Sequence, residues 1–254
     1  MSSASGRDLA RGAVAHRTEM PDAYADLVDL IRERATVAPF VVGIAGPVAV
    51  GKTTIVRELA RGLVSDGRSV HVMSTDAFLL PNAVLNERGL LMRKGVPESY
   101  DDSAIRDALG RLRSGESACV RVYSHDAYDI VPDARESIEP ADVILVEGVV
   151  ALQPLMIDCL DLAIYIDAAE ASVREWFVER FVRLTAAAAT DAASFYAPFV
   201  HMPAEQLRQL AYATWDGINA PNLHEHIAPS SLRADIIVRK SADHSIAELR
   251  VASK

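Results

Sequence analysis

The sequence has little cysteine. Cys119 and Cys159 are the only two among 254 residues, and they lie far apart. This pattern excludes the spacing of a structural zinc site and a small fold held together by disulfides. We interpret both residues as buried, reduced thiols.

Positive charge and long apolar runs are also scarce. Lysine and arginine total 26 against 35 acidic residues, a formal charge of −9, which argues against a basic surface for nucleic acid or anionic membranes. No apolar run reaches the length of a membrane span, and the first residues lack the apolar core of a signal peptide. We therefore expect a cytoplasmic protein without nucleic-acid or membrane partners.

Half of the residues are apolar, and they alternate between short continuous runs and stretches with helical spacing. The runs predict strands at residues 38–46, 69–73, 142–148, 160–167 and 234–240, and the spaced stretches predict helices at 21–35, 52–67, 101–115 and 168–184. This alternation predicts an α/β fold with a parallel sheet flanked by helices. The alanine-rich stretch 185–194 indicates a helix or lid. We expect residues 1–20 to be mobile and residues 21–254 to form a single domain.

The stretch "GIAGPVAVGKTT" carries a phosphate-binding loop between a predicted strand and a predicted helix. Its glycines let backbone N–H groups point at phosphate oxygens, Lys52 can reach the β- and γ-phosphates, and the Thr53 hydroxyl can ligate Mg²⁺. We assign nucleotide binding to the loop residues Gly46, Val48, Ala49, Gly51, Lys52, Thr53 and Thr54. The loop does not identify the phosphate acceptor.

Two carboxylates follow predicted strands. Asp76 comes just after the strand at 69–73, which we expect to be buried beside the loop-bearing strand, and Glu147 ends the strand at 142–148. Ligands of open parallel sheets bind at the carboxyl ends of the strands. Asp76 there can accept a hydroxyl proton or hold Mg²⁺, and Glu147 can hold metal-bound water. From spacing alone, Asp76 fits a helix cap or turn equally well.

Two further features leave alternatives open. The stretch "VYSHDAYDIVPD" contains Tyr123, His125 and Tyr128, and on its own it favours a strand end with polar groups facing solvent. Arg180 lies one helical turn from Trp176, where it can clamp a phosphate or carboxylate or form a solvated ion pair. Spacing does not choose between these roles.

Taken together, these segments resemble the bacterial type I pantothenate kinases. The matching stretches run in order from Phe40 to the C-terminus: "GIAGPVAVGKTT", "STDAFLLPNAVLNERGLLMRKGVPESYD", "VYSHDAYDIVPD", "VILVEG", "WDGINAPNLHEHI" and "KSADHSI". The resemblance implies a phosphate-loop kinase fold with a helical lid and acceptor region, usually dimeric. It implies transfer of the γ-phosphate of ATP, with Mg²⁺, to the primary hydroxyl of pantothenate, the first step towards coenzyme A.

The resemblance also implies roles for individual residues. It makes Asp76 the base, with Lys52 and Arg180 as further catalytic groups, and it places Thr53 and Glu147 at the metal. The residues that it places around the acceptor are Tyr123, His125, Tyr128, Phe177, Arg180, Ile218 and Asn219. His244 matches a histidine near the adenine, and Arg57 and His125 match positions that contact coenzyme A as an inhibitor.

The sequence departs from the family's pattern around the acceptor. Phe177 replaces a tyrosine and Val150 an asparagine, while Leu184, Thr185 and Ala189 stand where phenylalanine, arginine and phenylalanine are expected. Loss of aromatic side chains enlarges a binding pocket, and loss of polar groups changes how strongly the pocket discriminates between acceptors. Two alternatives therefore stay open: a related kinase acting on another hydroxyl compound, such as a nucleoside, a sugar acid or a pathway intermediate, and a nucleotide-binding regulatory protein without catalysis.

Overall fold

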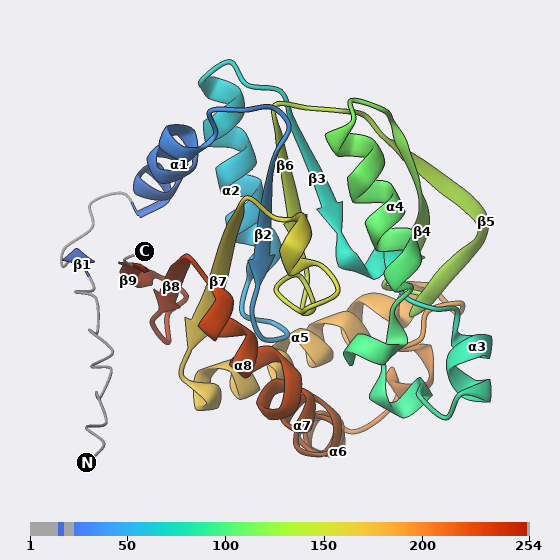
Figure 1. Ribbon diagram of the computed structural model, residues 1–254. Coiled ribbons are helices and arrows are strands. Elements are labelled where there is room, and N and C mark those ends of the chain that lie inside the picture. The colour runs from blue at the N-terminus through green and yellow to red at the C-terminus, as the bar shows by residue number, and fades with distance from the viewer. Residues whose placement is uncertain (1–14, 18–22, 253–254) are drawn as a thin grey trace, which may run out of the picture.

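A seven-stranded mixed sheet forms the centre of the computed structural model, which describes residues 15–17 and 23–252 (Figure 1). The strands lie in the order β1-β9-β8-β7-β2-β6-β3. The parallel strands are β3 (Val70–Ser74), β6 (Val143–Glu147), β2 (Phe40–Ala45), β7 (Leu162–Ala168) and β8 (Ile236–Lys240). The antiparallel strands β9 (Ile246–Val251) and β1 (Ala15–Arg17) complete one edge.

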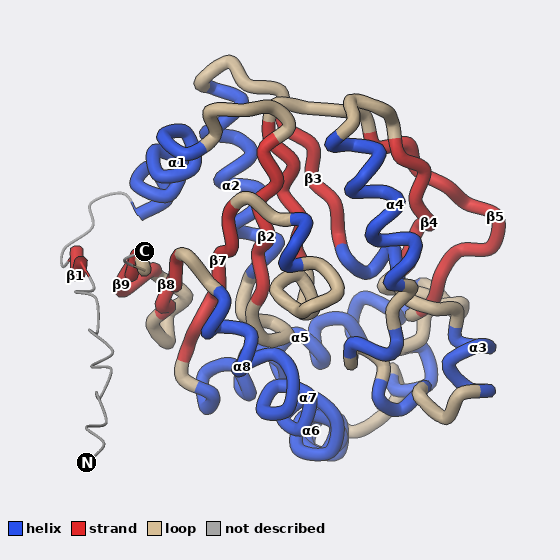
Figure 2. The backbone as a smooth tube through the Cα atoms, in the orientation of Figure 1, coloured by secondary structure: helices blue, strands red, loops and turns tan. Residues whose placement is uncertain are grey.

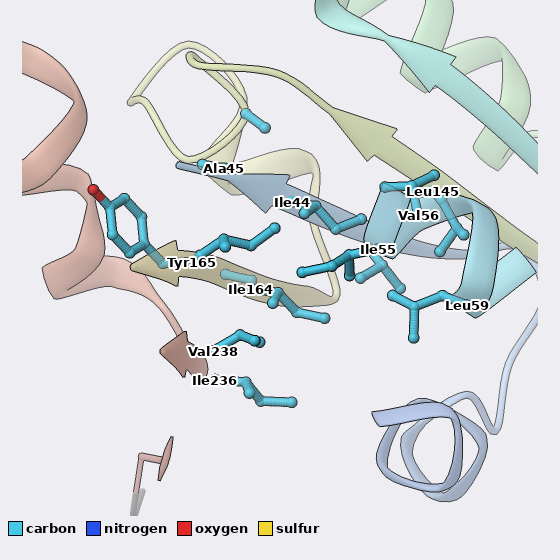
Figure 3. Close-up of a cluster of buried hydrophobic side chains, with 14 of the residues drawn as sticks. Ile44, Ala45, Ile55, Val56, Leu59, Leu145, Ile164, Tyr165, Ile236 and Val238 are labelled. Atoms are coloured by element: carbon cyan, nitrogen blue, oxygen red, sulfur yellow. The ribbon is translucent and has the colours of Figure 1, made fainter. Parts of the chain in front are cut away.

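The central strands are buried on both faces. Successive side chains of a strand point to opposite faces, so Val42 and Ile44 of β2 enter one hydrophobic core while Val41 enters the other. This explains why the sequence reads as continuous apolar runs there rather than as alternation. Figure 3 shows the first core, with Ile55 and Leu59 of the neighbouring helix beside the strand residues.

Amphipathic helices cover the two faces. Helices α1 (Ala23–Arg34) and α2 (Lys52–Ser65) bury one stripe each in the first core. Helix α4 (Asp102–Arg113) covers the second core together with a separate hairpin of β4 (Ala118–Ser124) and β5 (Asp129–Ile138). These elements support the sheet and leave its carboxyl edge free for other segments.

The remaining helices gather at the carboxyl edge of the sheet, as Figures 1 and 2 show. They are α3 (Asn82–Glu87), α5 (Glu170–Ala187), α6 (Ala204–Thr214), α7 (Ala220–Asn222) and α8 (Ala228–Ser230). Two π-helical turns, Trp215–Asn219 and Leu223–Ile227, separate the last three, and Trp215 is buried in the first core. Among the described residues, no helix is long and apolar enough to cross a membrane.

The structure confirms the α/β class and the predicted strands and helices, and it corrects two details. The strand β3 before Asp76 is an edge strand, partly exposed, and β6 separates it from β2. Cys119 is exposed and Cys159 is half-buried, so neither is a core thiol. The stretch from Val122 does contain a strand end, the last residues of β4, and it continues through the turn of the hairpin into β5.

The predicted mobile segment, residues 1–20, lies outside the described residues except for Ala15–Arg17, which form β1. The alanine-rich stretch begins as the last turn of α5 and continues as a short 3₁₀ turn, Ala188–Thr190. The expected helix therefore covers only the first residues of the stretch, which ends its helical course at Thr190.

Candidate active site

The phosphate loop joins the end of β2 to the start of α2. Gly46 has a φ of 151°, and a Cβ there would lie 2.6 Å from the carbonyl oxygen of Ile166 in the neighbouring strand β7. Only glycine fits a position that combines this dihedral with so close a strand. Ala49 also has a positive φ, of 66°, and Thr53 and Thr54 are exposed in the first turn of α2. The loop thus curls tightly in front of a helix N-terminus, as anion binding requires.

Lys52 lies across the mouth of the loop. Its Nζ donates to the carbonyl oxygens of Gly46 at 3.0 Å and Pro47 at 2.9 Å. Burial lowers the pKa of the Lys52 ammonium, while the negative charges of Glu147 and Asp76 act in the opposite direction. The ammonium is therefore held at the point where the loop, both carboxylates and a bound phosphate would meet.

Glu147 and Asp76 face the loop from two adjacent strands. Glu147 ends β6 in register with Ile44 of β2, and Asp76 lies in the 3₁₀ turn after β3, where its backbone N–H donates to Ser74 Oγ at 3.2 Å. The Thr53 hydroxyl donates to Glu147 Oε1 at 3.4 Å. Burial raises the pKa of Glu147, with a further rise from Asp76 that Lys52 opposes.

This oxygen-rich corner fits Mg²⁺. The ion prefers one or two carboxylates together with phosphate oxygens and water, rather than a cage made only of protein ligands. The described residues contain no cluster of three or more acidic, histidine or cysteine side chains with metal-site geometry. Thr53 and Glu147 are the side chains that would hold the ion.

A second group of polar residues lies on the other side of Asp76. His125 Nε2 is 4.0 Å from Asp76 Oδ2, and its ring meets the Tyr123 ring edge-on at 5.2 Å. Burial, foremost, raises the pKa of Tyr123 and raises that of Tyr128 to about 12. Both phenols are therefore neutral hydrogen-bonding groups at physiological pH.

Lys94 completes this group and was missed in the sequence. Its Nζ donates to Asn82 Oδ1 and to the carbonyl oxygen of Tyr128, both at 2.7 Å, and lies 4.8 Å and 4.5 Å from the centroids of the Tyr123 and Tyr128 rings. Burial lowers its pKa to about 8, against the opposing charges of Asp129 and Asp76. The basic and glycine-containing loop around "RKG" was the signal that could have indicated a cation site.

Aromatic residues from the segment after α5 close the far side of this group. The Phe195 backbone N–H donates to the carbonyl oxygen of Asp126 at 2.6 Å, and the Phe195 ring stacks on Tyr128 with 4.6 Å between the ring centroids. These two contacts join segments that lie far apart in the sequence. The segment after α5 is therefore fastened to the turn of the β4–β5 hairpin.

The same segment supplies aromatic rings that follow the alanine run 186–189. Tyr196 meets Phe181 edge-on at 5.5 Å, and Phe199 lies 5.9 Å from Phe181, between ring centroids. Thr185 is buried, and its hydroxyl donates to the carbonyl oxygen of Phe181 at 3.0 Å. An aromatic cluster is therefore present here although Leu184, Thr185 and Ala189 are not the residues that the resemblance implies. Part of the cluster comes from residues further along the chain.

Arg180 connects the two halves of the site. Its positive charge lowers the pKa of Lys52, on the nucleotide side, and opposes the effect of burial on the pKa of Tyr196, on the acceptor side. Phe177 packs against Trp215 at 5.7 Å and Phe181 at 6.2 Å between ring centroids. The position where the resemblance implies a tyrosine is thus part of an aromatic cluster.

The other predicted residues lie at different distances from this centre. Ile218 lines a pocket that Lys94 also lines, and Asn219 Nδ2 donates to the carbonyl oxygen of Thr214 at 3.4 Å. His244 stacks on Trp176 with 4.0 Å between the ring centroids, and Arg57 is exposed on α2. These contacts do not by themselves assign a ligand to Ile218, Asn219, His244 or Arg57.

Val150 takes no part in the polar site. Its side chain is buried in the second core, 1% exposed. The replacement of an asparagine at this position therefore changes core packing in this structure.

Comparison with known proteins identifies the family. The model of the phosphoribulokinase/uridine kinase family matches residues 41–183, which span the phosphate loop, both carboxylates and most of α5. A pantothenate kinase of Streptococcus pneumoniae serotype 19F (strain G54) is 37% identical over 242 residues, covering 92% of this chain and 78% of that protein. The chain belongs to the pantothenate kinase family. As a member of that family it is an ATP-dependent kinase.

Two further comparisons agree. A pantothenate kinase of Leifsonia xyli subsp. xyli (strain CTCB07) is 41% identical over 232 residues, covering 87% of this chain and 72% of that protein. Among solved structures, a putative fructose transport system kinase from Silicibacter sp. TM1040 superposes with a TM-score of 0.66 at 22% identity, covering 81% of this chain and 94% of that one. At that identity the structural likeness shows the fold alone.

Proposed function

We propose that this protein transfers the γ-phosphate of ATP to the primary hydroxyl of pantothenate, giving 4′-phosphopantothenate. The observation that carries the proposal is the place of Asp76, whose charge acts on Lys52 of the phosphate loop and on Lys94 of the acceptor group. A carboxylate between a phosphate cradle and a polar pocket is where a kinase needs its base. The curated pantothenate kinases of similar sequence support the choice of acceptor.

In this mechanism the protein acts by positioning and by charge. The loop from Gly46 to Thr53 holds the phosphates, and Asp76 accepts the proton of the attacking hydroxyl while aligning it with the γ-phosphorus. Lys52 and Arg180 stabilise the charge that develops on the transferred group. Mg²⁺ held by Thr53 and Glu147 would supply further charge neutralisation at the phosphates.

The acceptor group binds the rest of pantothenate. Tyr123, Tyr128 and His125 offer hydrogen bonds to its hydroxyl and amide groups, and the Lys94 ammonium offers a partner for its carboxylate. The aromatic segment from Phe195 excludes water, because a kinase must suppress hydrolysis of ATP.

The test is release of ADP from MgATP with and without pantothenate, compared with a panel of nucleosides, sugar acids and other hydroxylated metabolites. We expect strong stimulation by pantothenate at micromolar concentrations. Stimulation by another compound alone would replace the acceptor and keep the kinase. Tight nucleotide binding without stimulation by any compound would favour the regulatory alternative.

Phe177 gives a specific reason to include that panel. Its ring offers no hydroxyl to an acceptor, whereas a tyrosine would. Loss of a hydrogen bond in a binding site can change discrimination between acceptors by orders of magnitude. Phe177→Tyr should therefore lower the KM for pantothenate if pantothenate is the acceptor.

The same resemblance supports four further proposals: the protein is cytoplasmic, it is a homodimer, it requires Mg²⁺, and coenzyme A inhibits it. Arg57, exposed on α2, and His125, beside Asp76, are the residues proposed to contact coenzyme A. Sedimentation of the full chain tests the dimer. Inhibition by coenzyme A that Arg57→Ala relieves, with turnover retained, tests the contact.

A further inference from the structure

Lys240 reaches the phosphate loop from the other end of the chain. It is the last residue of β8, and its Nζ donates to the backbone carbonyl oxygen of Val50 at 3.0 Å, across a separation of 190 residues. The residue is only 7% exposed, and burial lowers the pKa of its ammonium. Burial of an ammonium group costs free energy even when a backbone carbonyl accepts its hydrogen bond. We therefore look for a function of this contact.

The hydrogen bond fixes a peptide plane inside the phosphate loop. The carbonyl of Val50 and the N–H of Gly51 belong to one trans peptide, in which the two groups point in opposite directions. Because Lys240 holds the carbonyl on its own side, the Gly51 N–H is directed away from Lys240. A loop that binds phosphate needs its N–H groups directed at the ligand.

Gly51 makes this approach sterically feasible. Its φ is 93°, and a Cβ at this position would lie 2.8 Å from Lys240 Nζ. Any other residue would meet the ammonium and would also be strained at that dihedral. Because Gly51 has no side chain, it leaves the space that the Lys240 ammonium occupies.

We propose that Lys240 is a positioning residue, which holds the Val50–Gly51 peptide in the orientation that phosphate binding requires. The inference rests on the nucleotide-binding part of the proposed function and is independent of the acceptor. Lys240 Nζ also lies 5.6 Å from the centroid of Trp176, the ring on which His244 stacks. Through that contact Lys240 could instead help to hold the adenine. The experiment therefore distinguishes an effect on phosphate binding from an effect on binding of the base.

The experiment compares nucleotides that carry phosphates with one that carries none. In Lys240→Met, the donor is removed while the aliphatic stem remains. We expect the affinity for MgATP and MgADP, measured by calorimetry, to fall about tenfold or more, the loss typical of a hydrogen bond made by a charged group. The affinity for adenosine should stay within about twofold, and the KM for ATP should rise while the KM for the acceptor does not.

Two variants serve as controls. Arg239→Met removes a positive charge from the exposed neighbour in the same strand, which pairs with Asp167, and should leave all these affinities unchanged. Lys240→Arg keeps a charged donor and should recover part of the MgATP affinity. Thermal unfolding of each variant without ligand shows whether the fold is intact.

Two results would overturn the inference. One is an unchanged MgATP affinity in folded Lys240→Met, and the other is an equal loss for adenosine, which would assign Lys240 to the base. If Lys240→Met does not fold, Lys240→Arg is compared with a Lys240→Gln variant of equal stability. Equal affinity of these two variants for MgATP would also overturn the inference. Failure of the proposed acceptor would appear instead in the wild-type protein, as nucleotide binding without phosphorylation of pantothenate.

Discussion

At the scale of single residues, the site is a line of charges with Asp76 in its middle. Lys52 and Glu147 lie towards the phosphate loop, whereas Lys94 and His125 lie towards the acceptor group. Asp76, Lys52, Glu147 and Lys94 are partly or fully withdrawn from water, and electrostatic interactions are stronger there than in bulk solvent, whereas the His125 side chain is 62% exposed. Removal of one member should therefore lower turnover.

Asp76→Asn tests the proposed base. The amide keeps the size of the side chain but cannot take a proton, so we expect kcat to fall by about 10²–10⁴-fold, the usual contribution of a general base. The affinity for MgATP should change little, because the loop and Lys52 remain. Steady-state kinetics and calorimetry measure the two quantities. Wild-type turnover in this variant would remove Asp76 from the chemistry.

Lys94 predicts a pH dependence on the acceptor side. Its pKa in the folded protein is about 8, below its ordinary value, so the ammonium loses its proton as pH rises through that value. If it holds the carboxylate of pantothenate, kcat/KM for pantothenate should fall above about pH 8, since that parameter reports ionisations of the free enzyme. Lys94→Met should have a lower kcat/KM that no longer falls as the pH rises through this value. If kcat/KM of the variant still falls over this pH range, the ionisation belongs to another group.

At the scale of elements, the site is assembled by one sheet edge and two segments that meet above it. The phosphate loop follows β2, Asp76 follows β3 and Glu147 ends β6, whereas the acceptor group comes from the β4–β5 hairpin and the segment after α5. The stack of Phe195 on Tyr128 joins these last two. The hairpin and the segment after α5 should therefore act together.

Phe195→Ala tests this connection. Phe195 is 42% exposed, so its removal should cost little stability, but it breaks an aromatic stack of about 0.5–1.5 kcal/mol. We expect a KM for the acceptor about two- to tenfold higher and faster hydrolysis of ATP without acceptor. Leu232→Ala, at a side chain that is 90% exposed, is the control. Equal kinetics of Phe195→Ala and the control would show that the segment does not close the site.

The elements also show which parts of the site the sequence can predict. The phosphate loop was predictable because its strand, glycines and helix lie within about one βα unit, where local patterns decide the geometry. Lys94, Phe195 and Lys240 were not singled out, because each acts through contacts with segments distant in sequence. The position of β3 was misjudged for the same reason: order along the chain does not fix order in a sheet.

At the scale of the whole molecule, the fold places the nucleotide site on the sheet that carries both hydrophobic cores. The loop-bearing strand β2 has all six residues buried, and it lies between β7 and β6. Binding of MgATP to the loop should therefore stabilise the cooperative core. Family and fold were predictable at this scale, because motif order and the alternation of strands and helices extend along most of the chain.

A thermal shift tests this coupling. A ligand at about 100 times its Kd adds about 2.7 kcal/mol to the free energy of unfolding, and each kcal/mol raises the Tm of a chain of this size by about 2–4 °C. We expect MgATP to raise Tm by several degrees in the wild type and much less in Lys52→Met. A shift of equal size in both would place the bound nucleotide away from the loop.

The most direct test of the account is the structure of the reaction product. Wild-type protein is incubated with MgATP and pantothenate, and the product is examined by phosphorus–proton NMR. We predict a phosphate coupled to the two protons of the primary alcohol carbon, formed together with one ADP, and formed about 10²–10⁴-fold more slowly with Asp76→Asn. Phosphate on another hydroxyl, or inorganic phosphate alone, would contradict transfer to the primary hydroxyl of pantothenate.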